Sequence, residues 1–333
     1  MIKNVYWLAA PGLQPYVNQG LEKALVDLAL PGELILYLWQ NQRTVVLGRH
    51  QNPWRECDLD RLEQDGGWLA RRISGGGAVY HDQDNLNFSF ILSREDYDLP
   101  RQQKIVLQAL RGLGLAAELS GRNDVLAAGR KLSGHAFWQG KSACLHHGTL
   151  LLQADGARMS AYLRPSAQKL AAKGVASVAS RVAGMRDFLP GLSLDQVKTA
   201  LIETAGQVWQ VPARPFDQQR LDQGVLDKNQ AFFADPAWRL AQPTPGNWYR
   251  ERRFPWGELQ LSLDIREQSI SRVQVYTDAL DESLPEGIIQ ALSGCPWPPP
   301  QAELARRLHE LKIGAELLSL LIGENMEETA HGK

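Results

Sequence analysis

The stretch RRISGGGAVYHDQDNLNFSF, residues 71–90, places two arginines directly before three consecutive glycines. From Leu86 to Leu92 apolar and polar residues alternate, which is typical of a β-strand with one face against the core. The residues that lead into the glycines, WLARRIS at 68–74, also have strand character. The glycines are therefore expected in a turn between two strands.

A glycine turn beside arginines is suited to an anionic ligand. Backbone N–H groups without a neighbouring Cβ can approach an anion closely, and the guanidinium of Arg71 or Arg72 matches carboxylate or phosphate oxygens. A dinucleotide-binding loop is disfavoured, because Tyr80 stands where G-x-G-x-x-G needs its last glycine and no helix-forming run follows. Glycine triplets also occur in flexible turns, so the triplet alone does not define a site.

The segment SGHAFWQGKS at residues 133–142 is similar to a P-loop but does not fit one. Five residues separate Gly134 from Gly140, where the G-x-x-x-x-G-K-[ST] pattern needs four. The flanking residues resemble two strands, with no helix after the motif. Residues 140–142 are therefore predicted to form a surface hairpin turn.

The composition is that of a globular protein in a reducing compartment. The 333 residues favour two domains, or one large domain with an appendage, and 44% are hydrophobic and 22% charged. No apolar run approaches the roughly 18 residues of a membrane span, and the first one stops at Pro11, too early for a signal peptide. The three cysteines are far apart and form no C-x-x-C pair, so neither disulfides nor a zinc ribbon are indicated. A cytoplasmic protein is expected.

The net charge of −1 provides no global attraction for nucleic acid. Neither nucleic acid nor a membrane is therefore an expected partner. An anionic ligand has to be met by a local cluster of cations, and the pair Arg71 and Arg72 is such a cluster.

Hydrophobic periodicity predicts alternating strands and helices in the first two thirds of the chain. Helices are predicted around Leu21 and Leu25, and at 58–66 and 103–114. Ser193 begins S-x-x-Q before an apolar-periodic stretch, which indicates the start of a helix with a capping box. The predicted strands are 5–10, 34–39, 44–48, 86–92, 130–138 and 144–153.

A domain boundary is predicted at AQPTPGNWY, residues 241–249, where two prolines and a glycine follow a helical region. The larger domain then covers residues 1–242, the linker 243–248, and the smaller domain 249–333. The smaller domain is predicted to contain a hairpin and two helices, which makes it a small α+β unit. These elements are the strands 259–265 and 269–278 and the helices 301–311 and 314–322.

Several polar residues are candidates for a site, and each also has an ordinary structural explanation. Lys131 begins a predicted strand and could extend its ammonium across a sheet into a pocket, although an edge lysine facing solvent is the commoner case. Asn123 and Asp124 could hold a nucleotide or a metal-bound phosphate, or simply form a turn. His81 with Asp82 could be an acid/base pair, or a turn after the glycine loop.

Three neighbouring residues on the predicted strand 144–153 raise two further possibilities. His146 and His147 point to opposite sides of a strand, so they do not readily bind one metal together, and a hydrogen-bonded core histidine is the default. Cys144 shares a face with His146, so a cysteine nucleophile with a histidine base is geometrically possible.

Taken together, these motifs resemble the lipoate-protein ligase A family, and the resemblance extends over nearly the whole chain. It implies a fold of the α+β class, with a large mixed-sheet domain shared by biotin ligases and class II aminoacyl-tRNA synthetases and a small C-terminal domain. The segments that carry it are LYLWQNQRTVVLGRHQNPWREC, RRISGGGAVYHDQDNLNFSF, GRNDVLAAGRKLSGHAF, LHHGTLLLQAD, QKLAAKGVASVASRV, RFPWGELQLSLDI and ISRVQVYTDAL.

The resemblance implies a two-step reaction in the cytoplasm by a monomeric enzyme. Lipoate and ATP, with Mg²⁺, give lipoyl-AMP and pyrophosphate. A lysine of an apo lipoyl-carrier domain then accepts the lipoyl group as an amide. The implied acceptors are the E2 subunits of 2-oxoacid dehydrogenases and the glycine-cleavage H protein.

The family's motifs map onto specific positions of this sequence. Lys131 is implied to contact both ATP and lipoate. The other implied contacts are Arg72, Gly77, Ala78, Val79 and Tyr80 for ATP, Ser74, Gly75, Gly76 and His81 for the lipoyl group or adenylate, and Asn123, Asp124 and His147 for nucleotide or magnesium, with Asp124 as the metal contact. An apolar slot for the dithiolane and its chain is expected around Leu47, Val79 and Phe88.

The sequence departs from the family pattern in two places. Asp84 replaces the glycine of H-D-x-G-N, which adds a carboxylate to that turn. The stretch 125–129 is shorter than in many relatives, which puts in doubt the closure of a loop over the adenylate.

Three rival functions are compatible with parts of the sequence. An ATP-independent octanoyl or lipoyl transferase shares the expected fold and works through a cysteine thioester. A non-catalytic lipoate- or nucleotide-binding protein could keep the fold without the reaction. A biotin ligase is disfavoured, because RRISGGGAV stands where such enzymes carry G-R-G-R-x-G-R-x-W.

Overall fold

The computed structural model describes residues 1–121, 123–165, 182–240 and 246–322. The chain divides into two compact units, residues 1–241 and 242–333. The division lies beside the linker expected at 243–248, of which residues 243–245 are outside the described ranges. No helix in the described ranges is long and apolar enough to span a membrane.

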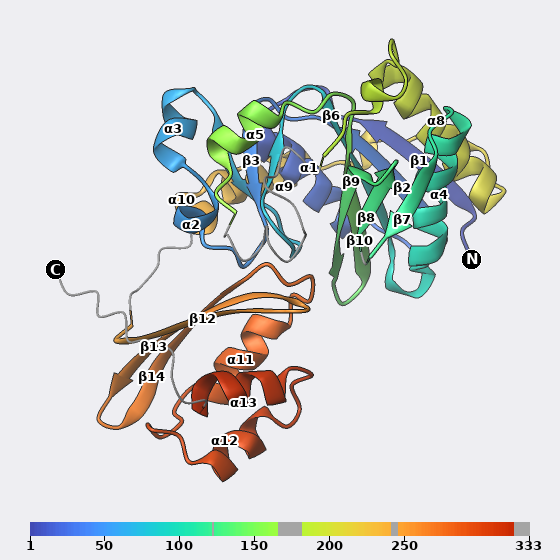
Figure 1. Cartoon of the computed structure of the whole chain (residues 1–333). Helices are drawn as coiled ribbons and strands as arrows, with labels where there is room; N and C mark the ends of the chain where they lie inside the picture. The colour runs from blue at the N-terminus through green and yellow to red at the C-terminus, as the bar shows by residue number, and fades with distance from the viewer. Residues whose placement is uncertain (122, 166–181, 241–245, 323–333) are drawn as a thin grey trace. The chain divides into compact units, whose positions relative to one another are not determined.

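The first unit is built on a mixed sheet of eight strands (Figure 1). The edge strand β11 is parallel to β1, and β1 is parallel to β2. Every other neighbouring pair in the sheet is antiparallel. In order across the sheet, the strands are β11 (Ala213–Pro215), β1 (Asn4–Ala9), β2 (Glu33–Trp39), β6 (Asn85–Ser93), β10 (Ala143–Leu151), β9 (Arg130–Gln139), β8 (Asp124–Ala127) and β7 (Ala117–Ser120).

Helices cover both faces of this sheet and form two hydrophobic cores. Helices α4 (Leu99–Gly112) and α8 (Leu194–Trp209) pack on one face, where Phe88 and Phe90 of β6 lie against them. Helices α1 (Pro15–Asp27) and α9 (Gln223–Ala234) pack against each other on the opposite face, over Tyr37 of β2. The predicted capping box of α8 is confirmed, because the Ser193 and Gln196 side chains exchange hydrogen bonds with each other's backbone N–H.

A smaller sheet lies on the α1 side and carries the glycine turn. Its strands are β4 (Trp68–Arg71), β3 (Thr44–Leu47) and β5 (Val79–His81), with β3 in the centre. Val46 and Ala70 join the core beneath α1, while the other face of the small sheet packs on short helices. The short helices of this unit are α2 (Pro53–Glu56), α3 (Leu59–Gln64), α5 (Gly156–Tyr162) and α10 (Pro236–Leu240).

Strand β6 confirms the predicted alternation, and its polar face is buried as well as its apolar face. All nine of its residues are buried. The apolar side chains of Phe88 and Phe90 enter the core beneath α4 and α8, whereas Asn87 and Ser89 face the space between the large sheet, α1 and the small sheet. The polar face of this strand is therefore an interior polar surface, which is a suitable lining for a ligand site.

The second unit is a three-stranded antiparallel sheet with helices (Figure 1). Its core combines the apolar side chains of the hairpin with those of the helices, including Leu261, Ile288 and Leu304. The predicted hairpin and both predicted helices are present, and a strand and a helix were not individually predicted. The elements are β12 (Trp248–Phe254), β13 (Gly257–Arg266), β14 (Ser269–Thr277), α11 (Leu284–Leu292), α12 (Gln301–Leu308) and α13 (Gly314–Ile322).

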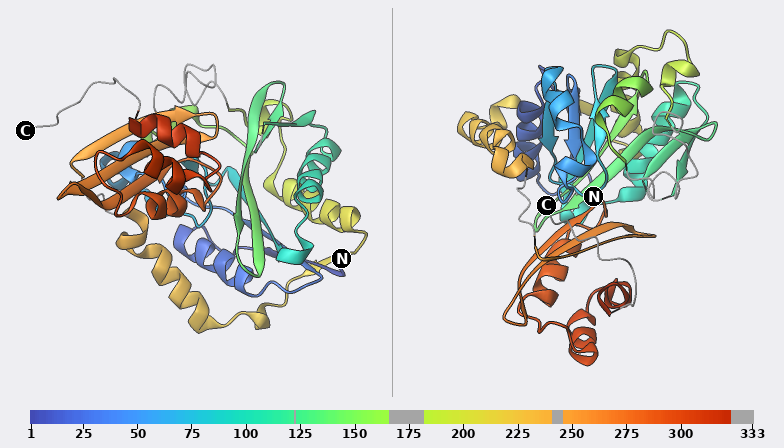
Figure 2. Two further views of the ribbon diagram at one scale, coloured as in Figure 1. Left: turned by 90° about the horizontal axis from the view of Figure 1, so that it is seen from below. Right: turned by 60° about the vertical axis from the view of Figure 1, so that its left-hand side comes forward.

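Two turns in the β-sheets decide questions that the sequence raised. Residues 140–142 connect β9 and β10 as the predicted hairpin turn, which excludes a P-loop there; the long β9–β10 hairpin is clearest in Figure 2. The stretch 125–129, expected to be a shortened loop, is instead most of strand β8 followed by a tight turn. In that turn Ala128 and Gly129 both have positive φ, 48° and 74°, as a two-residue hairpin connection requires.

Candidate functional site

Arg72 shapes the glycine turn from the inside. The residue is only 8% exposed, and its guanidinium donates to the carbonyl oxygens of Gly75 at 2.6 Å and Gly77 at 2.9 Å. Its Nε also donates to the Ser74 hydroxyl at 3.0 Å. Arg72 therefore holds three successive points of the turn, and the predicted contact between Arg72 and ATP stays a prediction.

Arg71 does not belong to a cation cluster for an anion, contrary to the prediction from sequence. The residue is 1% exposed and its guanidinium donates to backbone carbonyls on two sides. On one side are Gly48, Arg49 and Gln51, at 2.8–3.0 Å, and on the other are Trp238 and Arg239 of α10. Adjacent residues of a strand point to opposite faces, so Arg72 and Arg71 cannot serve the same ligand.

The turn also depends on a close approach between two glycines. A Cβ at Gly48 would collide with the carbonyl oxygen of Gly76 and would lie 3.3 Å from an Arg72 nitrogen. Gly76 has a φ of +88°, which lies in the left-handed region that favours glycine. Glycine is therefore required at both positions for the turn to pack on the end of β3.

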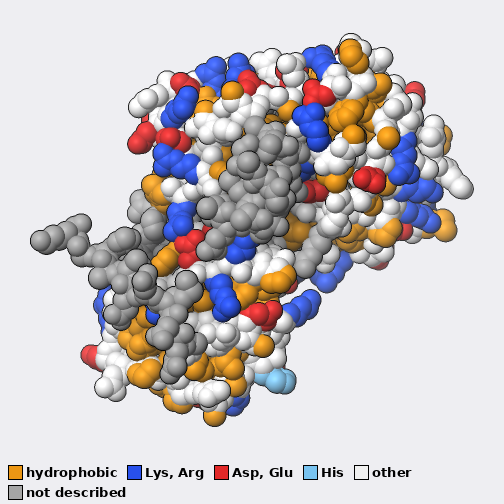
Figure 3. Space-filling view, viewed as in Figure 1, with side chains coloured by type: hydrophobic (Ala, Val, Ile, Leu, Met, Phe, Trp, Pro, Cys, Tyr) orange, Lys and Arg blue, Asp and Glu red, His pale blue; other side chains and the backbone are white. Residues whose placement is uncertain are grey.

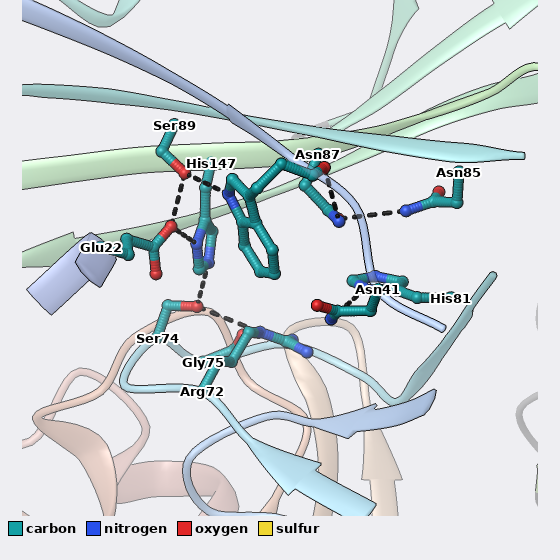
Figure 4. Close-up of polar contacts among 11 residues, drawn as sticks. Glu22, Asn41, Arg72, Ser74, Gly75, His81, Asn85, Asn87, Ser89 and His147 are labelled. Carbon is teal, nitrogen blue, oxygen red and sulfur yellow. Dashed lines mark hydrogen bonds and ion pairs between the residues drawn. The ribbon is translucent and has the colours of Figure 1, made fainter. Parts of the chain in front are cut away.

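A hydrogen-bonded network connects the glycine turn to helix α1 (Figure 4). The Ser74 hydroxyl lies 2.6 Å from Nε2 of His147, and Nδ1 of His147 donates to Oε1 of Glu22 at 2.9 Å. Glu22 also accepts from the Ser89 hydroxyl, which in turn accepts from Nε1 of Trp39 at 3.0 Å. Both ring nitrogens of His147 are thus bound by protein groups, and its predicted contact with nucleotide or magnesium stays a prediction.

His81, at the end of β5, lies beside this network. Its Nδ1 is 3.3 Å from the Asn41 amide, and its ring meets the Trp39 indole edge to face. Burial, together with the positive Arg72, lowers the pKa of His81 to about 3, so the ring is neutral at physiological pH. The Asn41 amide donates to Nδ1, so in the neutral ring the proton lies on Nε2, which is buried without a hydrogen-bond partner and can donate to a ligand.

Lys131 and Asp124 form a second polar cluster, on strands β9 and β8. The ammonium lies 2.7 Å from the Asp124 carboxylate, and both side chains are largely buried. A Cβ at Gly134 would lie 2.6 Å from Nζ of Lys131, so the absence of a side chain there leaves room for the ammonium. Because of a bulge in β9, Lys131 shares a sheet face with Gly134, and the N–H of Gly134 donates to the Thr149 hydroxyl, two residues from His147.

Asn123 lies next to this cluster, and its polar groups form hydrogen bonds with the backbone of His135. Its side-chain amide donates to the backbone carbonyl of His135, and its own carbonyl accepts from the His135 N–H. Residue 122 of the same motif is outside the described residues, as is most of the segment 168–182 that also carried the resemblance.

Asp84, the residue that departs from the family pattern, is balanced by a cation. Its carboxylate lies 3.5 Å from a guanidinium nitrogen of Arg186. Its backbone N–H donates to the Asp82 side chain, and its carbonyl accepts from the Leu152 N–H, so both backbone groups of Asp84 are hydrogen-bonded. The added charge is therefore neutralised locally at the surface.

The side chains of Leu47, Val79 and Phe88 do not form the apolar slot that was expected around them. Phe88 lies in the core beneath α4, Leu47 packs beneath the short helices outside the small sheet, and Val79 packs towards α1. These side chains point into three different cores because β6 and β3 each bury both faces. That expectation was wrong.

Comparison with known families gives these clusters a context. The lipoyl protein ligase A/B catalytic domain matches residues 14–206, and the bacterial lipoate protein ligase C-terminus matches residues 246–324. The chain belongs to the lipoyl protein ligase family. This confirms the resemblance stated from the sequence motifs.

Solved structures of lipoate-protein ligases share the fold. The P. falciparum LipL1 in complex with lipoate superposes with a TM-score of 0.83 at 23% identity, covering 96% of this chain and 99% of that one. A bipartite lipoate protein ligase from Thermoplasma acidophilum, described with its E2 lipoyl domain, has a TM-score of 0.64 at 29% identity and covers 74% and 100%. A lipoate-protein ligase A bound with ATP has a TM-score of 0.62 at 28% identity and covers 72% and 99%. The expected α+β fold is confirmed.

Several residues of the polar network around His147 and His81 were not predicted from the sequence. Glu22 lies in a helix whose apolar spacing was the only signal considered, and a single acidic residue on such a helix is usually on the solvent side. The polar residues of β6 were noticed as part of an alternation and given no role. The missed residues are Glu22, Trp39, Asn41, Asn87 and Ser89.

A pair of buried histidines lies on the other face of the sheet. Nδ1 of His146 is 3.0 Å from Oε1 of Gln102 in α4, and Nε2 of His146 is 3.0 Å from Nδ1 of His135. Burial, and next the Lys131 charge, lower the pKa of His135 to about 3, and burial lowers the pKa of His146 well below its ordinary value. Both rings are therefore neutral, and His146 is occupied in this pair instead of acting as a base for Cys144.

These neutral histidines predict a loss of stability in mild acid. In the unfolded chain His81 and His135 bind a proton near pH 6.5, but in the folded protein only near pH 3, so stability falls as the pH drops through this window. Each is expected to contribute about 2 kcal/mol of destabilisation between pH 7 and pH 5. Thermal unfolding followed by circular dichroism at the two pH values measures the loss, and His135→Gln should reduce it. An unfolding midpoint that is the same at both pH values would contradict the prediction.

Proposed function

We propose that this protein activates lipoate with ATP and transfers the lipoyl group to a lysine of apo lipoyl-carrier domains. The observation that carries the proposal is the largely buried Lys131 ammonium, held by Asp124 and given room by Gly134 in a chain of the ligase family. Further support comes from relatives whose structures are described with ATP or with lipoic acid, each at 28% identity.

The proposed first step joins two anions, which makes cations and N–H donors the main catalysts. A lipoate carboxylate oxygen attacks the α-phosphorus of ATP, the bond to the bridging oxygen breaks, and pyrophosphate leaves. Negative charge concentrates on the non-bridging oxygens, where an ammonium such as that of Lys131 stabilises the transition state. In the second step the acceptor's lysine amine attacks the acyl carbonyl, AMP leaves, and Lys131 polarises the carbonyl oxygen.

The glycine turn is the proposed nucleotide-binding segment. Gly77, Ala78 and Val79 are partly exposed, while Arg72 to Gly76 are buried beneath them. The backbone of residues 77–80 is proposed to bind ATP, with Arg72 holding the turn. Ser74, Gly75, Gly76 and His81 are proposed to face the lipoyl group or the adenylate, and the neutral His81 suits an uncharged part of the ligand.

Magnesium is proposed to enter with ATP. Mg²⁺ in such sites is usually held by one or two carboxylates together with substrate phosphates. Asp124 offers one carboxylate of this kind, and no cluster of three His, Cys, Asp or Glu side chains in metal-binding geometry occurs among the described residues. The residues present therefore fit an ion shared with the phosphates, which would screen their charge.

The proposed acceptors are lipoyl domains of 2-oxoacid dehydrogenases and the glycine-cleavage H protein. The T. acidophilum relative is described together with its E2 lipoyl domain, which supports this class of partner. On the face drawn in Figure 3 basic and acidic side chains are intermixed, and the net charge of −1 provides no overall attraction for nucleic acid. A monomeric, cytoplasmic enzyme remains the proposal.

The proposed function is tested by lipoate-dependent exchange of labelled pyrophosphate into ATP. Exchange that requires both lipoate and magnesium is expected, and modification of an apo lipoyl domain, measured by mass spectrometry, should follow. Exchange without modification would limit the protein to adenylation. No exchange by the folded protein in the presence of lipoate and magnesium would rule the proposal out, and a non-catalytic binding protein would then be favoured.

A transferase that works through a cysteine thioester is disfavoured by burial of the thiols. Burial raises the pKa of Cys144 and Cys295, and raises that of Cys57 to about 12, so all three are protonated and weakly nucleophilic near pH 7. Cys144→Ala is therefore expected to retain pyrophosphate exchange and transfer within about twofold, in both assays. A folded Cys144→Ala protein that has lost transfer from an acyl donor would instead support the transferase.

A further inference from the structure

Helix α1 contributes a buried carboxylate that no role proposed so far explains. Glu22 is 3% exposed, and its Oε1 accepts hydrogen bonds from both His147 and Ser89. A buried carboxylate is costly unless hydrogen bonds compensate its lost hydration. Both compensating donors come from strands of the large sheet, so Glu22 fixes α1 to a defined position over β6 and β10.

The direction of each hydrogen bond in the network follows from Glu22. A carboxylate only accepts, so Nδ1 of His147 carries the proton that it donates. When Nδ1 alone carries the proton, Nε2 is an acceptor, and the Ser74 hydroxyl donates to it at 2.6 Å. The Ser74 oxygen is left to accept from Nε of Arg72, at 3.0 Å. The four groups therefore form one ordered chain that ends at Glu22, as Figure 4 shows.

Arg72, at the other end of this hydrogen-bonded chain, sets the orientation of peptide groups in the glycine turn. Arg72 binds the carbonyl oxygens of Gly75 and Gly77. In a trans peptide the C=O and the following N–H point in opposite directions, so the N–H groups of Gly76 and Ala78 point away from the guanidinium. Two N–H groups oriented alike in one glycine turn are an arrangement that binds anions.

We propose that Glu22 is a positioning residue, which acts through His147 and Ser74 on Arg72 and so fixes the glycine turn in its anion-binding conformation. The proposal deepens the proposed function, because the anion would be the ATP phosphate or the adenylate. Glu22 itself need not touch the nucleotide. Through these hydrogen bonds, the conformation of the turn depends on a helix that lies more than forty residues earlier in the sequence.

The first test measures the turn without any ligand, by hydrogen–deuterium exchange of residues 74–78. Glu22→Gln, which keeps the shape but removes the charge, and Ser74→Ala are each expected to accelerate exchange there by about tenfold. Gln19→Met is the matched control, because Gln19 lies on the same helix, is 1% exposed and has both amide atoms without a hydrogen-bond partner. Gln19→Met should leave exchange in the turn within twofold of the unmodified protein.

Two further variants make the result decisive. The double variant Glu22→Gln with Ser74→Ala should exchange no more than twofold faster than either single variant, because both act through one chain. Ser89→Ala removes a hydrogen bond to the same carboxylate but on the branch to Trp39, and should leave the turn within twofold. Unchanged exchange in Glu22→Gln, or effects that multiply in the double variant, would overturn the proposal.

The nucleotide provides the second readout. ATP affinity, measured by calorimetry, is expected to fall about tenfold in Glu22→Gln and to be unaffected in Gln19→Met. If Glu22→Gln does not fold, Ser74→Ala and the Ser89→Ala comparison still test the chain. These measurements need no turnover, so absence of pyrophosphate exchange in the unmodified protein would reject the proposed function but leave this inference testable.

Discussion

Lys131→Ala is expected to reduce lipoate-dependent pyrophosphate exchange by roughly a thousandfold while the protein remains folded. The Lys131 side chain is 19% exposed and its ammonium lies 2.7 Å from the Asp124 carboxylate, so protein groups hold the ammonium in place. Removal of one preorganised donor at a site of developing charge typically lowers the rate constant by roughly a hundredfold to a thousandfold. A folded Lys131→Ala protein with more than a tenth of the original exchange would contradict the assignment of Lys131.

Two other variants separate the position of the ammonium from the mere presence of a lysine. Lys141→Ala removes an exposed lysine in the turn between β9 and β10 and should leave exchange unchanged. In Gly134→Ala the new Cβ would lie 2.6 Å from Nζ of Lys131, so the flexible end of that side chain has to move. Exchange should then fall by more than tenfold, with a thermal unfolding midpoint close to that of the original protein.

Arg71→Met is expected to destabilise the first unit by about 3–5 kcal/mol. The guanidinium is buried and donates to five backbone carbonyls. Methionine would occupy a similar volume but would leave these carbonyls without a donor. The opening free energy of β4, measured by native-state hydrogen exchange of its amides, reports the loss directly.

Arg214→Met is the matched control for this loss, since Arg214 is exposed on the edge strand β11. It should change the opening free energy of β4 by less than about 0.5 kcal/mol. An effect of Arg71→Met as small as that of the control would mean that water replaces the guanidinium at the carbonyls without cost.

Local patterns predicted much of the fold because local physics decides those elements. The alternation from Leu86 to Leu92 identified β6, and Ser193 with Gln196 identified the start of α8, since a side-chain period and a capping box are contained in a few residues. The short strand β8 was missed and mistaken for part of a loop. Its turn uses Ala128 at positive φ, where the usual signal would be asparagine or glycine.

The parts of the site that the sequence did not reveal depend on contacts between distant segments. Lys131 and Asp124 were both named, and they prove to be paired across two strands. Nothing near Arg71 indicates that its partners are carbonyls 20 to 23 and 167 to 168 residues away. Likewise Glu22 meets His147 across 125 residues, so its spacing in α1 carries no trace of that contact.

The hydrogen bonds from Arg71 to five backbone carbonyls also determine where this polypeptide can be truncated without separating Arg71 from its acceptors. Two of its carbonyl acceptors, Trp238 and Arg239, lie more than thirty residues beyond the end of the matched catalytic region at residue 206. A break at residue 206 would separate those acceptors from β4, the strand that leads into the glycine turn, and would separate the edge strand β11 from β1. A break after Leu240 would keep every acceptor named here on one piece. The first compact unit therefore extends through α10, well after the last residue of the match to the catalytic region.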